Sequence, residues 1–165
     1  NIRLKLSQKM FNLSKTDIKI TFAEKADFQT VLNINETVIS KLSNKCFLNW
    51  TTEGLTQELH QSKTLILKSD HEIVSYLIYR DLIDTFEIMS LATIVNQQKR
   101  GFQKLLIEEL KKKSIGFKKP IMLEVHEQNS VAIHLYETSQ FNKIGFRDRY
   151  YSDGAKAFIY HFSAK

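Results

Sequence analysis

The segment Gln98-Lys99-Arg100-Gly101-Phe102-Gln103 has the composition of an anion-binding loop. It lies between a predicted strand and a strongly periodic helix, so its backbone N–H groups would stand at a helix N-terminus beside two cations. Gly101 would let the backbone approach a bound pyrophosphate closely. A glycine before a helix is also common in ordinary turns, and the segment is neither a Walker loop nor a dinucleotide fingerprint. The spacing alone leaves both interpretations open.

A second group of candidates follows about twenty residues later. The segment Leu123-Glu124-Val125-His126 ends a predicted strand, and Asn129, Tyr136 and Phe141 lie 5, 12 and 17 residues beyond Glu124. A carboxylate can accept a proton from an amine, and a phenol, with an ordinary pKa of about 10, can donate one. Glu124 could equally be a salt-bridged residue at a strand end. Tyr136 lies on an apolar helical stripe, where an aromatic residue usually belongs to the core.

Alternating and helical patterns predict the elements of the N-terminal half. Ile18, Ile20 and Phe22 alternate with polar residues as in a half-buried strand, and Asp27 then offers an N-cap for a helix. Thr51 can cap a second helix directly after the single tryptophan, Trp50. Three further strands, which suggest an antiparallel meander, are predicted at Leu65–Lys68, Ile73–Tyr79 and Thr85–Thr93.

The C-terminal half continues with alternating helices and strands. Apolar residues recur at helical spacing from Phe102 to Leu110, and Pro120 stands at the entry of an apolar strand, Ile121–His126. A helix is predicted from Ser130 to Ser139. Two closing strands, Lys143–Tyr151 and Ala155–Phe162, flank Ser152-Asp153-Gly154, which has the signature of a hairpin turn. The predicted order is β-α-α-β-β-β-α-β-α-β-β, an α/β fold.

Together the motifs resemble those of the GCN5-related N-acetyltransferase (GNAT) superfamily, and within it the bacterial ribosomal-protein alanine N-acetyltransferases. The Gln98–Gln103 segment is similar to the family's acetyl-CoA loop, Q/R-x-x-G-x-G/A. Trp50-Thr51 resembles the Trp-Ser that opens the second helix of the family. The other matching positions are Glu87-Ile88, Leu91-Ala92-Thr93, Leu123-Glu124-Val125-His126, Asn129-Ser130, Ala132-Ile133, Leu135-Tyr136, Phe141, Gly145, Arg147 and Tyr150-Tyr151.

The resemblance implies a mixed, mostly antiparallel sheet that splays between its fourth and fifth strands, with flanking helices and an acetyl-pantetheine arm in the opening. Strand backbone would pair with the pantetheine amides, loop amides would hold the pyrophosphate, and Asn129 would hydrogen-bond the arm. The cofactor-binding residues implied in this way are Leu91, Ala92, Thr93, Gln98, Lys99, Arg100, Gly101, Phe102, Gln103, Lys104 and Asn129.

The resemblance also implies a direct transfer of acetyl from acetyl-CoA to an amine. Glu124 would accept the amine proton, Tyr136 would protonate the departing thiolate, and Trp50, Tyr150 and Tyr151 would line the acceptor site. The implied acceptor is a protein N-terminus, most specifically the N-terminal alanine of a small-subunit ribosomal protein. Two alternatives remain open: a superfamily member that acetylates a lysine, polyamine or other small amine, and a non-catalytic module that binds CoA or RNA.

Four positions depart from the family pattern. Gln103 stands where the loop usually ends in Gly or Ala, and Gln140 stands where Gly precedes Phe. His126 replaces an Arg, and Asn49 replaces a Pro. We expect these changes to affect substrate choice and affinity more than the fold.

The composition predicts one domain of an intracellular protein. The 165 residues suit a single domain, which we expect at residues 17–165 after a basic N-terminal appendage at residues 1–16. The single Cys46 excludes an internal disulfide, and no apolar stretch is long enough to span a membrane. The five histidines lack metal-site spacing. We therefore expect a cytoplasmic protein without a metal or a membrane contact.

The net charge of +6 favours anionic partners in general. Lysine-rich segments such as 111–113 and 118–119 are most simply a solvated helix end, so direct nucleic-acid binding is not expected.

Overall fold

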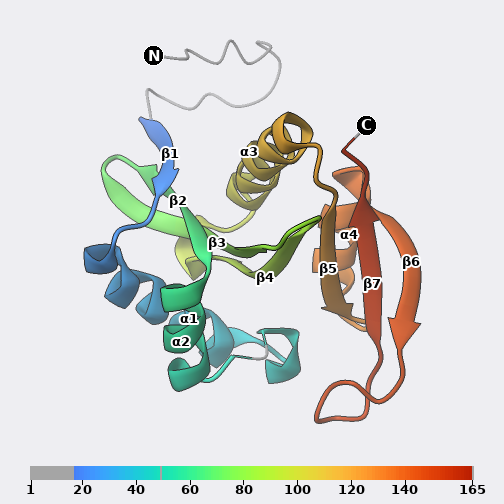
Figure 1. The fold of residues 1–165 in the computed structure, drawn as a ribbon. Coiled ribbons are helices and arrows are strands. Elements are labelled where there is room, and N and C mark those ends of the chain that lie inside the picture. The colour runs from blue at the N-terminus through green and yellow to red at the C-terminus, as the bar shows by residue number, and fades with distance from the viewer. Residues whose placement is uncertain (1–16, 49, 165) are drawn as a thin grey trace.

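The computed structural model describes residues 17–48 and 50–164, so the N-terminal segment 1–16 lies outside the described residues. It contains a seven-stranded sheet with helices on both faces (Figure 1). The strands are β1 (Ile18–Phe22), β2 (Lys63–Ser69), β3 (Glu72–Asp81), β4 (Phe86–Thr93), β5 (Ile121–His126), β6 (Asn142–Arg147) and β7 (Ala157–Phe162). The helices are α1 (Phe28–Lys41), α2 (Thr52–Gln61), α3 (Phe102–Phe117) and α4 (Ser130–Thr138), and 3₁₀ turns lie at Lys25–Asp27, Lys45–Leu48 and Val95–Gln97.

The predicted element order and fold class are confirmed. The strands lie in the order β1-β2-β3-β4-β5-β7-β6, and neighbouring strands are antiparallel except for β4 and β5, which are parallel. Crossover through α3 makes that parallel pair possible, because parallel neighbours need a long connection. No helix in the described ranges is long and apolar enough to cross a membrane.

The prediction for the two closing strands is wrong at their junction. β6 ends at Arg147 and β7 begins at Ala157, so Ser152-Asp153-Gly154 belongs to a longer loop, residues 148–156, and not to a tight hairpin turn. The amides of Tyr150 and Tyr151 both donate to the Ala155 carbonyl, at 3.0 and 3.2 Å. Because these bonds lie within the loop, residues 150 and 151 do not continue the pairing between β6 and β7.

Two hydrophobic clusters cover the two faces of the sheet. On one face, Leu106 and Leu110 of α3 pack against β4 and β5 with Leu123. On the other, Val31 of α1 and Leu55 of α2 pack with apolar residues of β2 and β3. Each face of the sheet therefore borders a different set of helices.

The predicted splay between the fourth and fifth strands is confirmed. β4 and β5 pair only from Phe86↔Ile121 to Ile88↔Leu123 and separate beyond that point. The pairing of β3 with β4 shifts there too, because Ile78 faces Ser90 while Tyr79 faces Ile88. Met89 is thus an extra residue in β4, a β-bulge, and bulges bend the strand that carries them.

A buried ion pair fastens α2 to the sheet. Arg80 of β3 donates to both carboxylate oxygens of Glu58, from Nε at 2.8 Å and from Nη2 at 2.6 Å. Glu58 is 1% exposed. Burial alone would raise the pKa of Glu58, but hydrogen bonds from Arg80, Ser62 and Gln61 outweigh it and lower the pKa below the ordinary value.

We expect Glu58→Gln to reduce the free energy of unfolding at pH 7 by about 3 kcal/mol, because it leaves the partly buried Arg80 guanidinium without its counter-charge. Since the folded pKa is the lower one, the contribution of Glu58 is complete above its unfolded pKa and is lost as the pH falls through the folded pKa. Urea denaturation from pH 7 down to pH 3 should show the two proteins converging below about pH 4.

The matched control is Glu53→Gln, an exposed change in the first turn of the same helix. It should cost no more than about 0.5 kcal/mol. Equal losses for the two variants would contradict the assignment.

Candidate functional site

The bulge in β4 is held from outside by the single tryptophan. The Trp50 indole Nε1 donates to the Met89 carbonyl at 3.0 Å, and the ring packs on the α1–α2 side of the sheet. The sequence predicts an acceptor-lining role for Trp50; the structure gives it a defined contact with the strand that opens. A carbonyl that is released from the ladder at a bulge needs such a partner.

Beyond the bulge, β4 presents a free backbone edge toward β5. Ile94 donates to Val74 of β3, and hydrogen-bonded residues alternate along an antiparallel pair, so Leu91 and Thr93 direct their peptide groups toward the gap. The Thr93 carbonyl accepts a hydrogen bond from Gln98 Nε2 at 3.1 Å. The Ala92 carbonyl accepts one from Ser75 Oγ at 2.8 Å and faces β3. Of the three predicted strand residues, Leu91 and Thr93 therefore face the opening.

The α3 N-terminus forms the predicted loop of amides. Lys99 and Gly101 adopt left-handed conformations with φ of 61° and 81°, and the first intrahelical bond runs from the Leu105 amide to the Gly101 carbonyl. Within the described chain, the amides from Lys99 to Lys104 find no backbone acceptor. The left-handed φ of Gly101 favours glycine at this position. Space does not require it, because a Cβ at this position would meet no atom within 4 Å.

The side chains of this loop divide into buried and exposed groups. Phe102 is buried in the core beneath α3, and the Arg100 guanidinium lies 5.1 Å from the centre of its ring. Lys99, Lys104 and Gly101 are exposed, and Gln103 is partly exposed. The arrangement places cations and unpaired amides at one helix N-terminus, as an anion site requires.

Glu124 lies on the face of β5 that is turned toward α1 and α2. Its Oε1 accepts a hydrogen bond from Arg147 Nε at 2.5 Å, and Tyr150 lies beside the same carboxylate. The hydrogen bond to Glu124, followed by burial, raises the pKa of Tyr150. Glu124 therefore forms the salt bridge at a strand end that one of the two interpretations of the sequence predicts. Because Arg147 is 59% exposed in its side chain, the pair stays open to exchange with solvent.

Tyr136 lies on the opposite face of β5. It is 8% exposed and packs in the α3-side core, with ring centres 5.8 Å from Phe141 and 6.5 Å from Tyr160. Burial raises the pKa of Tyr136, so the phenol stays protonated through the neutral range.

Tyr151, in the loop 148–156, is a partly buried tyrosine near Tyr150 and Glu124. Burial, and after it the neighbouring Tyr150, Glu124 and Tyr136, raise the pKa of Tyr151.

Asn129 has a structural bond that the sequence analysis does not assign to it. Its Oδ1 accepts the Ala132 amide at 3.2 Å and so caps α4. Asn is a preferred N-cap residue, so an Asn directly before the predicted helix start at Ser130 could have indicated this role from the sequence.

Gln140, where the family has Gly, adopts a left-handed conformation with a φ of 68°. This φ favours glycine, so the side chain must compensate for the strain. The buried Lys111 donates to Gln140 Oε1 at 2.9 Å and also to Glu108 Oε1 at 3.0 Å. Gln140 therefore gives a buried ammonium group an acceptor.

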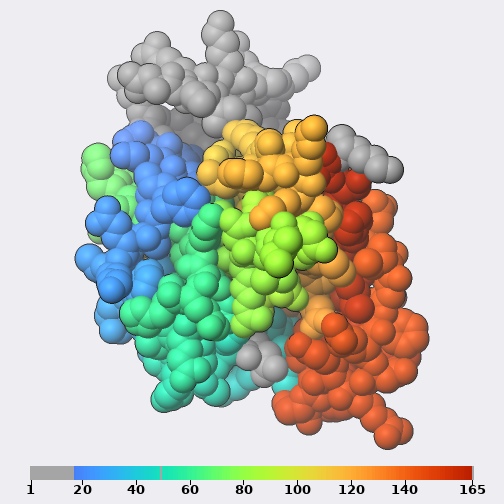
Figure 2. Space-filling model, in the orientation of Figure 1, coloured from blue at the N-terminus to red at the C-terminus, as the bar shows by residue number. Residues whose placement is uncertain are grey.

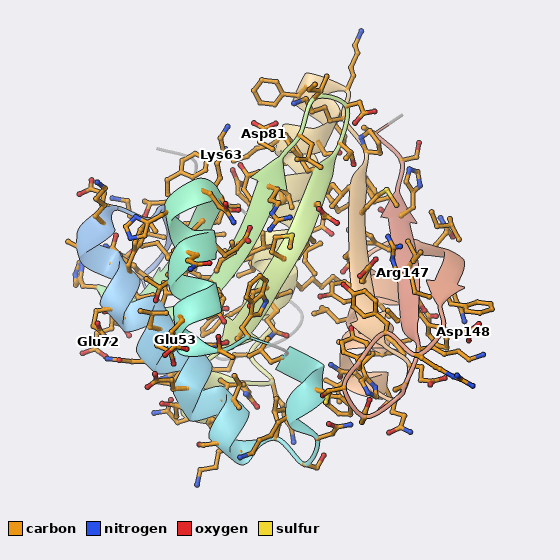
Figure 3. All side chains as sticks on the ribbon, turned by 60° about the horizontal axis from the view of Figure 1, so that its bottom comes forward. Glu53, Lys63, Glu72, Asp81, Arg147 and Asp148 are labelled. Atoms are coloured by element: carbon orange, nitrogen blue, oxygen red, sulfur yellow. The ribbon has the colours of Figure 1, made fainter. Side chains whose placement is uncertain are left out.

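Two residues of the site receive no functional role from the sequence analysis. Glu87 of β4 pairs with Met122 of β5, two residues before Glu124 on the same face, and its charge contributes to the raised pKa of Arg147 and Tyr150. Arg147 appears there only as a matching position. Figure 3 shows Arg147 on the inner side of the β6–β7 unit and Asp148 at its outer edge.

No group of three or more potential metal ligands occurs in the part of the chain that the structure describes.

Sequence comparison decides the family. A profile of the acetyltransferase (GNAT) family matches residues 36–141. The chain belongs to the GNAT family. This assignment makes it an acetyl-CoA-dependent N-acetyltransferase and agrees with the splayed sheet.

Two curated relatives of this GNAT chain are [ribosomal protein bS18]-alanine N-acetyltransferases. The one from Haemophilus influenzae is 34% identical over 91 residues, which are 53% of this chain and 60% of the relative. The one from Haemophilus ducreyi is 28% identical over 137 residues, 73% of this chain and 92% of the relative. The first match thus spans less than two thirds of the relative's length.

Solved structures share the fold. The ribosomal-protein-S18-alanine N-acetyltransferase from Escherichia coli superposes with a TM-score of 0.77 at 20% identity, over 90% of this chain and 95% of that chain. The structure of yncA from Salmonella typhimurium with its cofactor acetyl-CoA gives a TM-score of 0.70 at 17% identity, over 90% and 94% of the two chains.

We expect Trp50→Phe to raise the KM for acetyl-CoA about five-fold, because loss of one hydrogen bond at the bulge is worth about 1 kcal/mol and loosens the edge that faces the gap. Steady-state kinetics at saturating acceptor would measure it. Amide exchange of Leu91 and Thr93 should quicken, while β2 serves as an internal reference. Unchanged exchange at β4 would show that the indole is not needed to hold the bulge.

Proposed function

We propose that this enzyme acetylates the N-terminal α-amine of a protein, and that the acceptor is the N-terminal alanine of a small-subunit ribosomal protein. The observation that supports the proposal is that Glu124 and Tyr136 lie on opposite faces of the sheet at β5, the strand from which β4 separates beyond Ile88↔Leu123. The names of the Haemophilus relatives support the choice of acceptor.

The β4–β5 gap and the α3 N-terminus fit acetyl-CoA. Leu91 and Thr93 offer peptide groups that could pair with the pantetheine amides, as an added strand would. The amides from Lys99 to Lys104, with their exposed cations, would hold the pyrophosphate. Acetyl-CoA supplies the activated acyl group as a thioester. The free nitrogen of the Asn129 side chain is left to bind the arm, because its oxygen is used by the α4 cap.

Glu124 would serve as the base. An α-amine has a pKa of about 7.7 to 8.0, so it needs only a modest acceptor for its proton. Glu124 is half-buried and is fixed by Arg147 and Tyr150 at the acceptor side of β5. With Glu87 nearby, this corner carries two carboxylates against one guanidinium, which favours the approach of an ammonium group.

Tyr136 would serve as the acid. The amine nitrogen forms a bond to the thioester carbon, the carbon–sulfur bond breaks, and the thiolate takes the phenolic proton. Burial keeps the phenol protonated until the thiolate forms, so the proton is available at the moment of bond breaking. Because a thiol has an ordinary pKa near 8.5, below the raised pKa of the phenol, this transfer would be uphill, and the departure of CoA as a thiol would complete it. The phenolate would regain its proton from solvent as the products leave.

A lysine side chain, a polyamine or another small amine is the second candidate acceptor, because two carboxylates attract any ammonium group. We expect a peptide that begins with alanine to give a kcat/KM at least about tenfold above an N-acetylated, lysine-containing peptide, since tenfold is 1.4 kcal/mol of discrimination. Mass spectrometry of products locates the acetyl group. Acetylation of a free polyamine but of no peptide would contradict the proposal.

Replacing the proposed base or acid tests the chemistry directly. We expect Glu124→Gln and Tyr136→Phe each to lower kcat about 100-fold or more, as general acid–base groups typically contribute 10² to 10⁴, while the Kd for CoA changes little. Single-turnover kinetics with an excess of enzyme would measure the chemical step.

Each replacement has a matched control. Glu87→Gln removes the other carboxylate of the acceptor side, and Tyr160→Phe removes a phenol of β7 whose hydroxyl donates to Glu137 at 2.8 Å. Both controls should keep kcat within about threefold, well below the effect of losing an acid–base group. A larger loss for Glu87→Gln than for Glu124→Gln would reassign the base.

A further inference from the structure

One carboxylate, that of Asp153, holds the 148–156 loop to two distant segments. Its Oδ2 accepts a hydrogen bond from Asn44 Nδ2 at 2.9 Å and another from His126 Nε2 at 2.9 Å. Its Oδ1 accepts the Ala155 amide at 3.1 Å. Asn44 lies in the α1–α2 connection and His126 ends β5, so Asp153 bridges three parts of the fold. Figure 2 shows the orange-red region of this loop next to cyan residues of that connection.

The histidine of this bridge is held in one tautomer. His126 Nδ1 accepts the Gln128 amide at 3.1 Å, so the ring hydrogen is on Nε2 and is donated to Asp153. The side chain of His126 is completely buried. Hydrogen bonds from Asn44, His126 and the Ala155 backbone lower the pKa of Asp153 to about 2, so the bridge contains a carboxylate at neutral pH.

A chain of aromatic rings continues from the bridge to the proposed base. The His126 ring lies between those of Phe47 and Tyr151, with centres 5.0 and 4.7 Å away. The Tyr151 ring contacts Tyr150 edge-on with centres 5.2 Å apart, and Tyr150 lies close enough to Glu124 for that carboxylate to raise its pKa. A shift of Asp153 would therefore move the two tyrosines relative to Glu124.

We propose that Asp153 and His126 are positioning residues that fix Tyr150 and Tyr151 against Glu124 and so shape the acceptor side. The acceptor rests on the proposed function, whereas the bridge rests on the contacts above. The family pattern has Arg at the position of His126. An arginine has no acceptor for the Gln128 amide, so it could not make both the Gln128 and the Asp153 contacts that His126 makes. A second contact, Cys46 Sγ to Ser152 Oγ at 3.3 Å, joins the same two segments.

The decisive comparison is Asp153→Asn against Asp148→Asn in the full chain. Both changes remove one carboxylate from the same loop, but Asp148 is exposed and pairs only with Lys156, at 3.3 Å, among the described residues. We expect Asp153→Asn to raise the KM for an alanine-initiated peptide about tenfold, the effect of losing a hydrogen bond to a charged group. The KM for acetyl-CoA should stay within about twofold, and Asp148→Asn should change neither constant.

Hydrogen exchange on the enzyme without substrates tests the bridge independently of activity. The amides of Tyr150, Tyr151 and Gly154 bond within the loop at 2.9 to 3.2 Å, so loosening of the loop would speed their exchange. We expect at least about tenfold faster exchange in Asp153→Asn and unchanged exchange in Asp148→Asn.

Asn44→Ala and His126→Phe keep the test decisive if Asp153→Asn folds poorly. Asn44→Ala removes the donor to Asp153 together with the Oδ1 that accepts the Cys46 amide, in a connection outside the helices. His126→Phe keeps a ring between Phe47 and Tyr151 without its hydrogen bonds. Both should raise the peptide KM and the loop exchange rate in the same sense as Asp153→Asn.

The outcomes separate the bridge from the proposed function. Faster loop exchange without acetylation of any peptide supports the bridge and contradicts the acceptor. Peptide acetylation with equal constants and equal exchange rates for Asp153→Asn and Asp148→Asn overturns the bridge and leaves the acceptor standing.

Discussion

The site depends on one extra residue in a strand. Met89 has no counterpart in the β3–β4 register, and at the same point β4 ends its pairing with β5. A strand that stays bonded to one neighbour through its length must bend at the bulge, and the bend turns it away from the other neighbour. The Trp50 indole satisfies the carbonyl that the bulge releases. The gap is therefore built into the folded ladder and does not require a substrate to open it.

The two faces of β5 carry different side chains next to the gap. Side chains alternate along a strand, so Leu123 and Val125 enter the α3-side core while Glu124 points to the opposite face. Tyr136 reaches the same strand from the α3 side through α4. A thioester that crosses the sheet between β4 and β5 would have a proton acceptor on one side and a proton donor on the other. The same alternation keeps the cofactor and the acceptor on separate paths.

Local sequence patterns predict the elements, but not the contacts that complete the site. The α3 periodicity and the Thr51 cap depend on neighbours within a few residues, and both appear in the structure. The Glu124 and Tyr136 positions follow from a motif of fixed spacing. The Asn44–Asp153 bond joins residues 109 apart, and such a pairing leaves no trace in a single sequence.

One prediction is wrong and two features are not predicted, each for a physical reason. Tyr150 and Tyr151 continue an apolar pattern past the end of β6, so the sequence predicts a strand where backbone bonds to Ala155 form a loop. The bulge at Met89 is a slip of one residue within an apolar run, which changes no periodicity that a pattern could detect. The left-handed conformation of Gln140 could not be predicted either, because the contact that accompanies it is a hydrogen bond from Lys111, 29 residues away in the sequence.

The net charge of +6 hides a division of charge that the chemistry of transfer requires. The donor carries phosphates and the acceptor carries an ammonium group, so a uniformly basic surface would repel one of its two substrates. The exposed cations Lys99, Arg100 and Lys104 gather at the α3 N-terminus, where the helix dipole adds to their field. Glu87 of β4 and Glu124 of β5 lie on the sheet face opposite α3, around Arg147. The splayed sheet thus separates a cationic region from an anionic one, and at the proposed site each substrate would meet the sign that attracts it.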